Sequence, residues 1–277
     1  MKKLLVSALF ICGILIANAQ AVKTPSPSTS QTVKQEFGLG TVELSYSRPN
    51  MKGRKIYGDL VPYNAVWRTG ANSATTLTFS DEVIIGGTKV PAGKYGLLTI
   101  PGANEWTIVI SKQTDVTSPA AYKQDQDVVR FKASPVAMPF EIETFTIMFS
   151  AVKSNSLELG IMWDKTYVPV EIKADIDTKV MAQIDAAMNK DNKPYFQSAM
   201  YYMENGKDLN KANEWLDKAL AQNPSAFWVW HQKANCLAKL GKKSEAVTAA
   251  NKSIELAKAA KNDDYVSLNN KLLATLK

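Results

Sequence analysis

Apolar residues recur at every second position over much of the chain between Val33 and about Lys173. This alternation is typical of half-buried β-strands. Turn signals such as Gly86-Gly87 and Pro101-Gly102 interrupt it at short intervals. The alternating positions include Leu44, Tyr46, Leu77, Phe79, Ile108, Ile110, Phe145, Ile147, Phe149, Leu157, Leu159 and Ile161. The pattern predicts about nine short antiparallel strands, closed into a β-sandwich or barrel over residues 33–173.

After Asp175 the apolar residues follow a helical period instead. The segments are punctuated by Pro194, Gly206, Pro224, Gly241 and Asp263. These residues are typical of helix ends, so residues 174–277 are predicted to form an all-α domain. The fold class of the whole chain is then α+β, with the β domain first.

Two segments of the helical half repeat one another, because Lys218-Ala219-Leu220 aligns with Lys252-Ser253-Ile254 34 residues later. Helix, short turn and helix at this period resemble the tetratricopeptide repeat. The packing positions of that repeat are taken here by Trp230, Ala234, Gly241, Ala246 and Ser253. In such a stack large aromatic residues usually fill the core, so we expect Trp215, Trp228 and Trp230 there.

The N-terminus has the form of a secretory signal peptide. Met1-Lys2-Lys3 precedes an apolar run from Leu4 to Ala17, which ends in the small-x-small motif Ala17-Asn18-Ala19. The run is shorter than the roughly 20 residues that span a bilayer, so no membrane span is expected once residues 1–19 are removed. We expect an exported protein, periplasmic or secreted, that begins with a flexible leader over residues 20–32.

The chain has 33 lysines and arginines against 26 acidic residues, a net charge of +7. Its lysines are scattered along the whole length, which is typical of a solubility feature and does not favour nucleic-acid binding. The four arginines are distributed differently, because three of them lie between Tyr46 and Asn72. Arginine in place of lysine suggests a need for its planar fork of five donors.

This arginine-rich stretch leaves two interpretations open. As a ligand-binding patch, its arginines hold an anionic or glycan-like ligand between aromatic walls, with an amide as a further donor. As a structural device, the same arginines fasten a long connection to Asp59, Glu43 or strand-end carbonyls, which partly buried arginines do routinely and which we favour. The candidate ligand-binding residues are Tyr46, Arg48, Arg54, Tyr63, Trp67, Arg68 and Asn72.

No complete catalytic or metal-binding motif is present in the sequence. His231 is the only histidine, and it is interpreted as a helix-face residue because no H-x-x-x-H or C-x-x-C spacing accompanies it. The sequence also lacks G-x-S-x-G and a glycine-rich loop that opens a helix. Asp125 and Asp127 lie two apart in a polar loop without the further oxygen ligands of a calcium site. Neither a cofactor nor a metal is expected.

Several runs resemble the bacterial family known as domain of unknown function 2911, over roughly residues 30–173. The runs are Tyr46-Ser47-Arg48-Pro49, Gly53-Arg54-Lys55-Ile56, Gly58-Asp59-Leu60-Val61-Pro62-Tyr63, Val66-Trp67-Arg68-Thr69-Gly70-Ala71-Asn72, Pro91-Ala92-Gly93-Lys94-Tyr95-Gly96, Ile100-Pro101-Gly102, Glu105-Trp106-Thr107 and Glu143-Thr144-Phe145-Thr146-Ile147. The resemblance implies an exported β-rich domain, often followed by helical repeats, in Bacteroidetes-like bacteria. It brings no assigned reaction. The chain reads Pro119-Ala120-Ala121-Tyr122 where family members commonly have Trp-Gly-Ala-Tyr.

Three hypotheses follow for the function. The first is an exported, non-enzymatic binding protein whose β domain takes an anionic or glycan-like ligand and whose helical repeats contact a protein or peptide. The second is an exported hydrolase in which Arg68 stabilises an oxyanion and Asp59 or Asp127 acts as the base. In the third, the helical repeats are the partner-binding module and the β domain is a scaffold.

Overall fold

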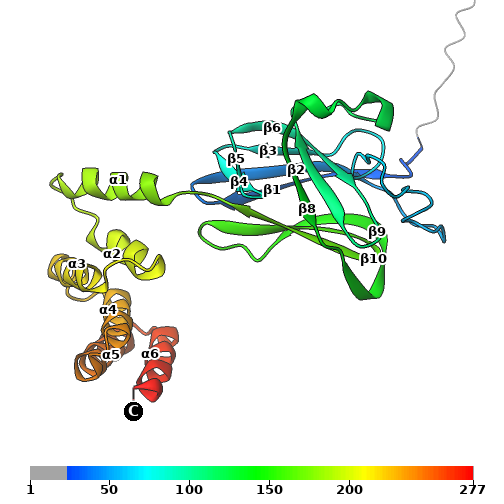
Figure 1. The fold of residues 1–277 in the computed structure, drawn as a ribbon. Coiled ribbons are helices and arrows are strands. Elements are labelled where there is room, and N and C mark those ends of the chain that lie inside the picture. Colours follow the sequence, from blue (N-terminus) through cyan, green and yellow to red (C-terminus); the bar gives the residue numbers. More distant parts are fainter. Residues whose placement is uncertain (1–23, 277) are drawn as a thin grey trace, which may run out of the picture. The chain divides into compact units, whose positions relative to one another are not determined.

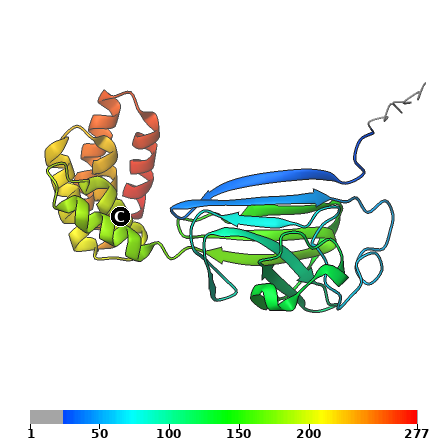
Figure 2. The ribbon, with the colours of Figure 1, turned by 90° about the horizontal axis from the view of Figure 1, so that it is seen from above.

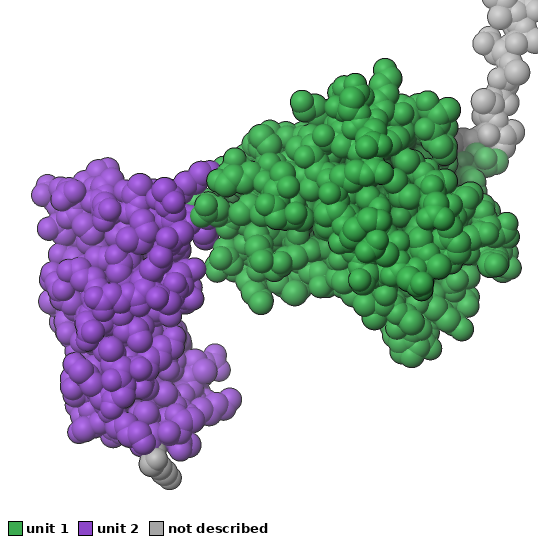
Figure 3. Space-filling view, in the orientation of Figure 1, with its two compact units in different colours: residues 1–175 green, residues 176–277 purple. Residues whose placement is uncertain are grey.

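The computed structural model describes residues 24–276, and the predicted signal peptide lies outside them. Contacts divide the chain into a β unit, which ends at Asp175, and a helical unit, which begins at Ile176 (Figure 3). Each unit is described by itself. Among residues 24–276, no helix combines the length and the apolar character that crossing a bilayer requires.

The β unit consists of two antiparallel sheets, which confirms the predicted fold class (Figures 1 and 2). Its strands are β1 (Thr29–Phe37), β2 (Gly40–Arg48), β3 (Thr76–Phe79), β4 (Val83–Ile85), β5 (Thr88–Val90), β6 (Gly93–Ile100), β7 (Trp106–Ser111), β8 (Asp127–Ala133), β9 (Val136–Ser150) and β10 (Ser156–Lys173). The larger sheet has the order β1-β2-β3-β6-β7-β8, and the smaller has the order β5-β4-β10-β9. Their facing side chains form one apolar core.

The first strand begins earlier than the sequence pattern predicts. Residues 29–32 were expected in the flexible leader, but Thr29 pairs with Arg48 and Thr32 pairs with Ser45 in an antiparallel ladder. These residues are exposed and polar, so no hydrophobic alternation announces them. Backbone hydrogen bonds to the neighbouring strand hold an edge strand in the sheet, and they do not depend on its side chains.

Strands β6 and β7 are buried on both faces. Leu97 and Ile110 face the core between the sheets. Their neighbours Leu98 and Val109 belong to a second, smaller cluster that includes Val116 from the segment after β7. This segment contains the 3₁₀ turns η1 (Pro119–Ala121) and η2 (Gln124–Gln126). It therefore covers the outer face of the larger sheet, and its position matters for the site.

The helical unit contains α1 (Asp177–Met188), α2 (Tyr195–Glu204), α3 (Leu209–Gln222), α4 (Phe227–Lys239), α5 (Lys243–Ala259) and α6 (Asp263–Thr275). From α2 onward, each helix packs against the next one along the chain, as in a stack of helical hairpins. Small residues such as Ala212, Ala246 and Ala250 are fully buried and allow the helices to approach closely. Trp215 lies in the core as expected, whereas Trp230 is only partly buried and Trp228 is 38% exposed.

A buried polar network joins three of these helices. His231 of α4 is bonded through Nδ1 to Asn269 Oδ1 of α6, at 2.8 Å. Asn269 Nδ2 donates to Ser253 Oγ of α5 and to the carbonyl of Tyr265. Since the Asn269 amide nitrogen is the donor in both bonds, its oxygen is an acceptor, and the proton of neutral His231 is assigned to Nδ1. Asn235 Nδ2 lies 3.0 Å from His231 Nε2, which then acts as the acceptor. The histidine is therefore part of the packing of the helical unit.

Candidate functional site

The arginine-rich stretch comprises the end of β2, with Arg48, and most of the long connection from β2 to β3, at one end of the sandwich (Figures 1 and 2). It is fastened to both sheets by backbone hydrogen bonds. Phe145 N of β9 donates to Pro49 O, and Trp67 exchanges bonds with Thr99 of β6 in both directions, at 2.8 and 3.0 Å. Gly70 has φ +156°, and a Cβ there would lie 3.0 Å from Ser47 O. Glycine therefore permits this close turn.

Two aromatic residues of the connection enter the core of the sandwich. Trp67 stacks on Trp163 of β10, with ring centroids 6.0 Å apart, and meets Phe145 edge-on at 5.1 Å. Tyr57 contacts both Trp67 and Trp106 edge-on. Trp67 Nε1 donates to Gly70 O at 3.0 Å. These contacts hold the connection in one conformation, so any site on it is preformed.

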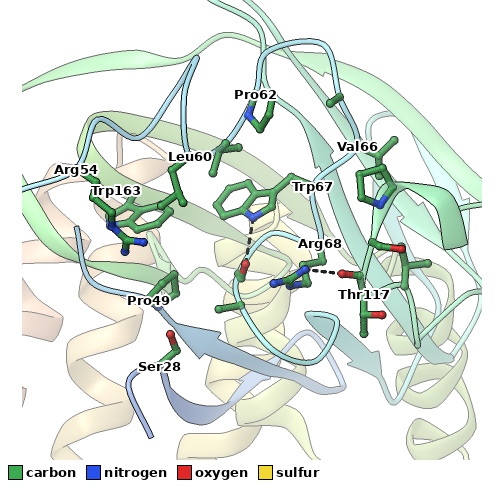
Figure 4. A pocket seen from close by; sticks show the side chains of 17 residues that line it. Ser28, Pro49, Arg54, Leu60, Pro62, Val66, Trp67, Arg68, Thr117 and Trp163 are labelled. Atoms are coloured by element: carbon green, nitrogen blue, oxygen red, sulfur yellow. Dashed lines mark hydrogen bonds between the residues drawn. The ribbon is translucent and has the colours of Figure 1, made fainter. Parts of the chain in front are cut away.

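A pocket of about 380 Å³ opens beside this aromatic cluster (Figure 4). Most of its wall comes from the connection, and the rest comes from β10, the start of the chain's described part and the segment after β7. Its lining residues are Ser28, Pro49, Arg54, Leu60, Val61, Pro62, Ala65, Val66, Trp67, Arg68, Gly70, Ala71, Val116, Thr117, Ser118, Pro119 and Trp163. The lining is mainly apolar, carries two guanidinium groups and contains no carboxylate.

Arg68 has hydrogen-bond donors to spare. Its Nη1 donates to the carbonyl oxygen of Thr117, 49 residues away in the sequence. Its Nε is buried and has no hydrogen-bond partner among residues 24–276. A buried donor left unpaired costs about 1–3 kcal/mol, so native proteins rarely keep one without a reason.

Arg54 lines the same pocket, but two of its three guanidinium nitrogens are engaged. Its Nε donates to Met51 O at 2.9 Å, and its Nη2 donates to Asn50 O at 2.6 Å. Both acceptors are backbone carbonyls of the preceding turn. Arg54 therefore closes that turn on itself and adds positive charge to the pocket.

The remaining candidates are brought to the same end of the sandwich but do not line the pocket. Arg48 donates from Nε to Phe145 O and from Nη2 to Thr146 Oγ1, which ties β2 to β9. Asn72 donates to Ser28 O at 3.1 Å. The Tyr46 hydroxyl is bonded to both the carbonyl and the amide of Ile147, at 3.0 Å each. Tyr63 is 41% exposed and lies over Gly58.

The carboxylates that the hydrolase hypothesis needs are not in the pocket. Asp59 is exposed and does not line it. Asp127 of β8 accepts hydrogen bonds from Tyr122 and from Arg130, the latter at 3.1 Å. Burial raises the pKa of Tyr122 to about 12, and the hydrogen bond to Asp127 acts in the same direction. Asp127 is thus engaged in a local network instead of facing Arg68.

Two residues that complete the site could not be assigned to it from the sequence. Trp163 continues the alternation of Leu157, Leu159 and Ile161, so the pattern indicates a core residue and nothing more. Thr117 contributes a backbone carbonyl, which every residue has. Among residues 24–276, no group of three or more His, Cys, Asp and Glu side chains is placed to hold a metal ion.

Two hollows of the helical unit adjoin one another, because Lys193 and Tyr195 line both. One, of about 370 Å³, also contains Pro194, Phe196 and the exposed Trp228. The other, of about 400 Å³, is lined on one side by Lys211, Trp215 and Lys218 and on the other by Asp185, among other residues. Lys211 and Lys218 both pair with Glu214, at 2.9 and 2.6 Å, so Lys193 is the lysine of these hollows without an ion pair among residues 24–276.

The comparisons with known proteins identify one family. A family model described as "Protein of unknown function (DUF2911)" matches residues 28–172, which contain β1 to β9 and all of β10 except its last residue. No curated protein and no solved structure matches this chain.

Proposed function

This chain belongs to the DUF2911 family of proteins of unknown function, and from that premise we propose that it is a binding protein whose β unit takes a small anionic molecule. The observation that carries the proposal is the pocket at Arg68. It combines a guanidinium whose donors are only partly used with a lining that contains no carboxylate. Perturbed or unpaired polar groups in an apolar pocket are a usual sign of a ligand site.

The geometry supports binding over hydrolysis. A hydrolase needs a general base within hydrogen-bond reach of the reacting group. Asp59 and Asp127 lie outside the lining, and Asp127 is held by Tyr122 and Arg130. An anion held by Arg68 therefore has no carboxylate of the pocket beside it to activate a water molecule.

The chain is also proposed to act outside the cytoplasm. The support is the charged, apolar and small-residue sequence of residues 1–19. N-terminal sequencing of the protein from fractionated cells tests this point. A mature terminus near Gln20 in the envelope or the medium is the expected result, and an intact Met1 in the cytoplasm would contradict it.

The test of anion binding compares thermal unfolding with and without ligands. A panel of carboxylates, phosphates, sulfates and neutral sugars is added to the purified protein and to the variants Arg68→Lys and Arg48→Lys. A ligand at about 100 times its Kd stabilises a protein by roughly 2.7 kcal/mol, which shifts Tm by roughly 5–10 °C for a chain of this size. We expect at least one anion to produce such a shift in the parent and a much smaller one in Arg68→Lys.

Arg48→Lys is the matched control, because it makes the same change at an arginine outside the pocket. It should lower the Tm of the free protein, since lysine cannot make both bonds to Phe145 and Thr146. It should leave the ligand-induced shift intact. A panel without any anion that shifts Tm, or a shift that survives Arg68→Lys unchanged, would contradict the proposal.

A second binding role is proposed for the helical unit. The adjoining hollows that share Lys193 and Tyr195 favour an acidic, partly aromatic peptide, since Trp228 and Tyr195 offer apolar faces and Lys193 offers charge. Fluorescence anisotropy with labelled penta-glutamate and penta-lysine peptides tests it. Binding of the acidic peptide alone, weakened by Lys193→Glu and by salt, is expected. Equal binding of both peptides would exclude the site.

A further inference from the structure

We infer that the ligand of the β unit is a monocarboxylate with an apolar body, whose carboxylate pairs with the Nε–Nη2 edge of Arg68. This inference rests on the proposed function, since it names the chemical class of the anion in the same pocket. It follows from three features of the site: the donors still unused, the placement of the two arginines, and the character of the remaining wall.

The first feature is the edge of Arg68 that remains unused. A guanidinium offers parallel N–H pairs along its edges, and such a pair matches the two oxygens of one carboxylate. Arg68 uses Nη1 on Thr117 O, and within residues 24–276 neither its Nε nor its Nη2 has an acceptor. Nε and Nη2 form one such edge. Arg54 has the reverse arrangement, because its Nε and Nη2 are both bonded to backbone carbonyls. Arg68 therefore keeps one unpaired edge at the wall of the pocket, formed by Nη2 and the buried Nε.

The second feature is the separation of the two arginines. Figure 4 shows Arg54 beside Trp163 and Arg68 beside Thr117, at different sides of the pocket. A phosphoryl group carries about −1.5 to −2 charges and three acceptor oxygens at neutral pH, so it needs more donors than a single fork supplies. Besides the two arginines, the polar side chains of the lining are the hydroxyls of Ser28, Thr117 and Ser118. The lining contains no lysine and no histidine. A planar group with a single negative charge therefore matches these hydrogen-bond donors best.

The third feature is the apolar character of the rest of the wall. Leu60, Val66, Trp67, Val116 and Trp163 present aliphatic and aromatic surface. The pocket's 380 Å³ lies within the usual range for small-molecule sites, roughly 300–1,000 Å³. A neutral sugar would leave most of its hydroxyl groups facing carbon atoms, where each unpaired group is penalised. An apolar body attached to the carboxylate instead covers this surface and gains hydrophobic contact.

Isothermal titration calorimetry with four probes tests the inference on the purified parent protein. Phenylacetate has both the carboxylate and the apolar body. Phenylacetamide lacks the charge, acetate lacks the apolar body, and benzylphosphonate replaces the carboxylate with another anion. We expect phenylacetate to bind and each of the other three to bind at least about tenfold more weakly. These comparisons need no variant, so they hold even if a substitution at Arg68 impairs folding.

Two variants then locate the bound carboxylate. Arg68→Lys removes the fork but keeps the charge, and it should weaken phenylacetate binding roughly 10- to 100-fold, as the loss of charge-assisted hydrogen bonds implies. Arg48→Lys, which changes an arginine outside the pocket, should leave the affinity for phenylacetate within about twofold of the parent.

The outcomes separate this inference from the proposed function. If benzylphosphonate binds more tightly than phenylacetate and this binding is lost in Arg68→Lys, the preference for a carboxylate is contradicted. Anion binding at Arg68, the proposed function, would still stand. Equal binding of phenylacetate and phenylacetamide would overturn the preference for a carboxylate as well. If none of these probes binds and no anion of the thermal panel shifts Tm, both the inference and the proposed function fail.

Discussion

Replacing Trp163 with alanine is expected to lower the free energy of unfolding of the β unit by about 3–5 kcal/mol. Trp163 is 1% exposed, stacks on Trp67 and meets Phe145 edge-on at 5.5 Å. Its Nε1 also donates to Glu143 O at 3.1 Å. The substitution leaves a large cavity and removes one of the two hydrogen bonds to Glu143 O, which still accepts from Met51 N. It also removes the surface against which the arginine-rich connection packs. Urea unfolding followed by near-ultraviolet circular dichroism measures the change.

The same substitution at Trp228 is the matched control, since Trp228 is 38% exposed in the helical unit. Surface substitutions usually change stability by less than about 0.5 kcal/mol, so Trp228→Ala should leave the transition of the β unit where it is. A loss below about 1 kcal/mol in Trp163→Ala would show that the aromatic cluster is not what holds the connection. Because Trp163 lines the pocket, its loss should also abolish any ligand-induced shift in Tm.

Replacing Asn269 with alanine is expected to destabilise the helical unit by about 2–4 kcal/mol, through the loss of several buried hydrogen bonds at once. Asn269 is fully buried and bonds to His231 of α4 and Ser253 of α5 from its place on α6. Without its amide, the Nδ1 proton of His231 has no acceptor. Far-ultraviolet circular dichroism during thermal unfolding follows this transition.

Asn270→Ala controls for the change in helix propensity, because Asn270 is the next residue of α6 and is exposed. Alanine is the better helix former, so this variant should be as stable as the parent or slightly more stable. The double variant Asn269→Ala with His231→Ala should be less destabilised than the sum of the two single variants. Strict additivity would mean that the two side chains do not act as one network.

Much of the fold is determined by the periodicity of the sequence. The period-two pattern predicted strands around Leu44, Ile108 and Ile161, and these residues lie in the core between the two sheets. Alternation works here because each sheet has one face on a common core. It gives no signal for residues 29–32, since both faces of the start of β1 are exposed and backbone pairing alone places them in the sheet.

In the helical half, periodicity predicted the helices, but it did not predict which large residue lies outside the core. Trp215 lies in the core at 6% exposure, whereas Trp228 is 38% exposed. Both lie on amphipathic helices with apolar neighbours. The difference depends on which neighbouring helix covers each face, and the sequence of a single helix does not contain this information.

The sequence by itself determined the β class of the first half, the helical class of the second, and the gathering of three arginines between Tyr46 and Asn72. Only the tertiary structure decided which arginine keeps donors for a ligand. Arg48 bonds through Nε and Nη2 to Phe145 and Thr146, and Arg54 bonds through Nε and Nη2 to Met51 and Asn50. Arg68 bonds only through Nη1, to Thr117. A guanidinium's free donors depend on the carbonyls that the fold brings beside it. Backbone carbonyls are the same in every residue, so no sequence pattern marks them.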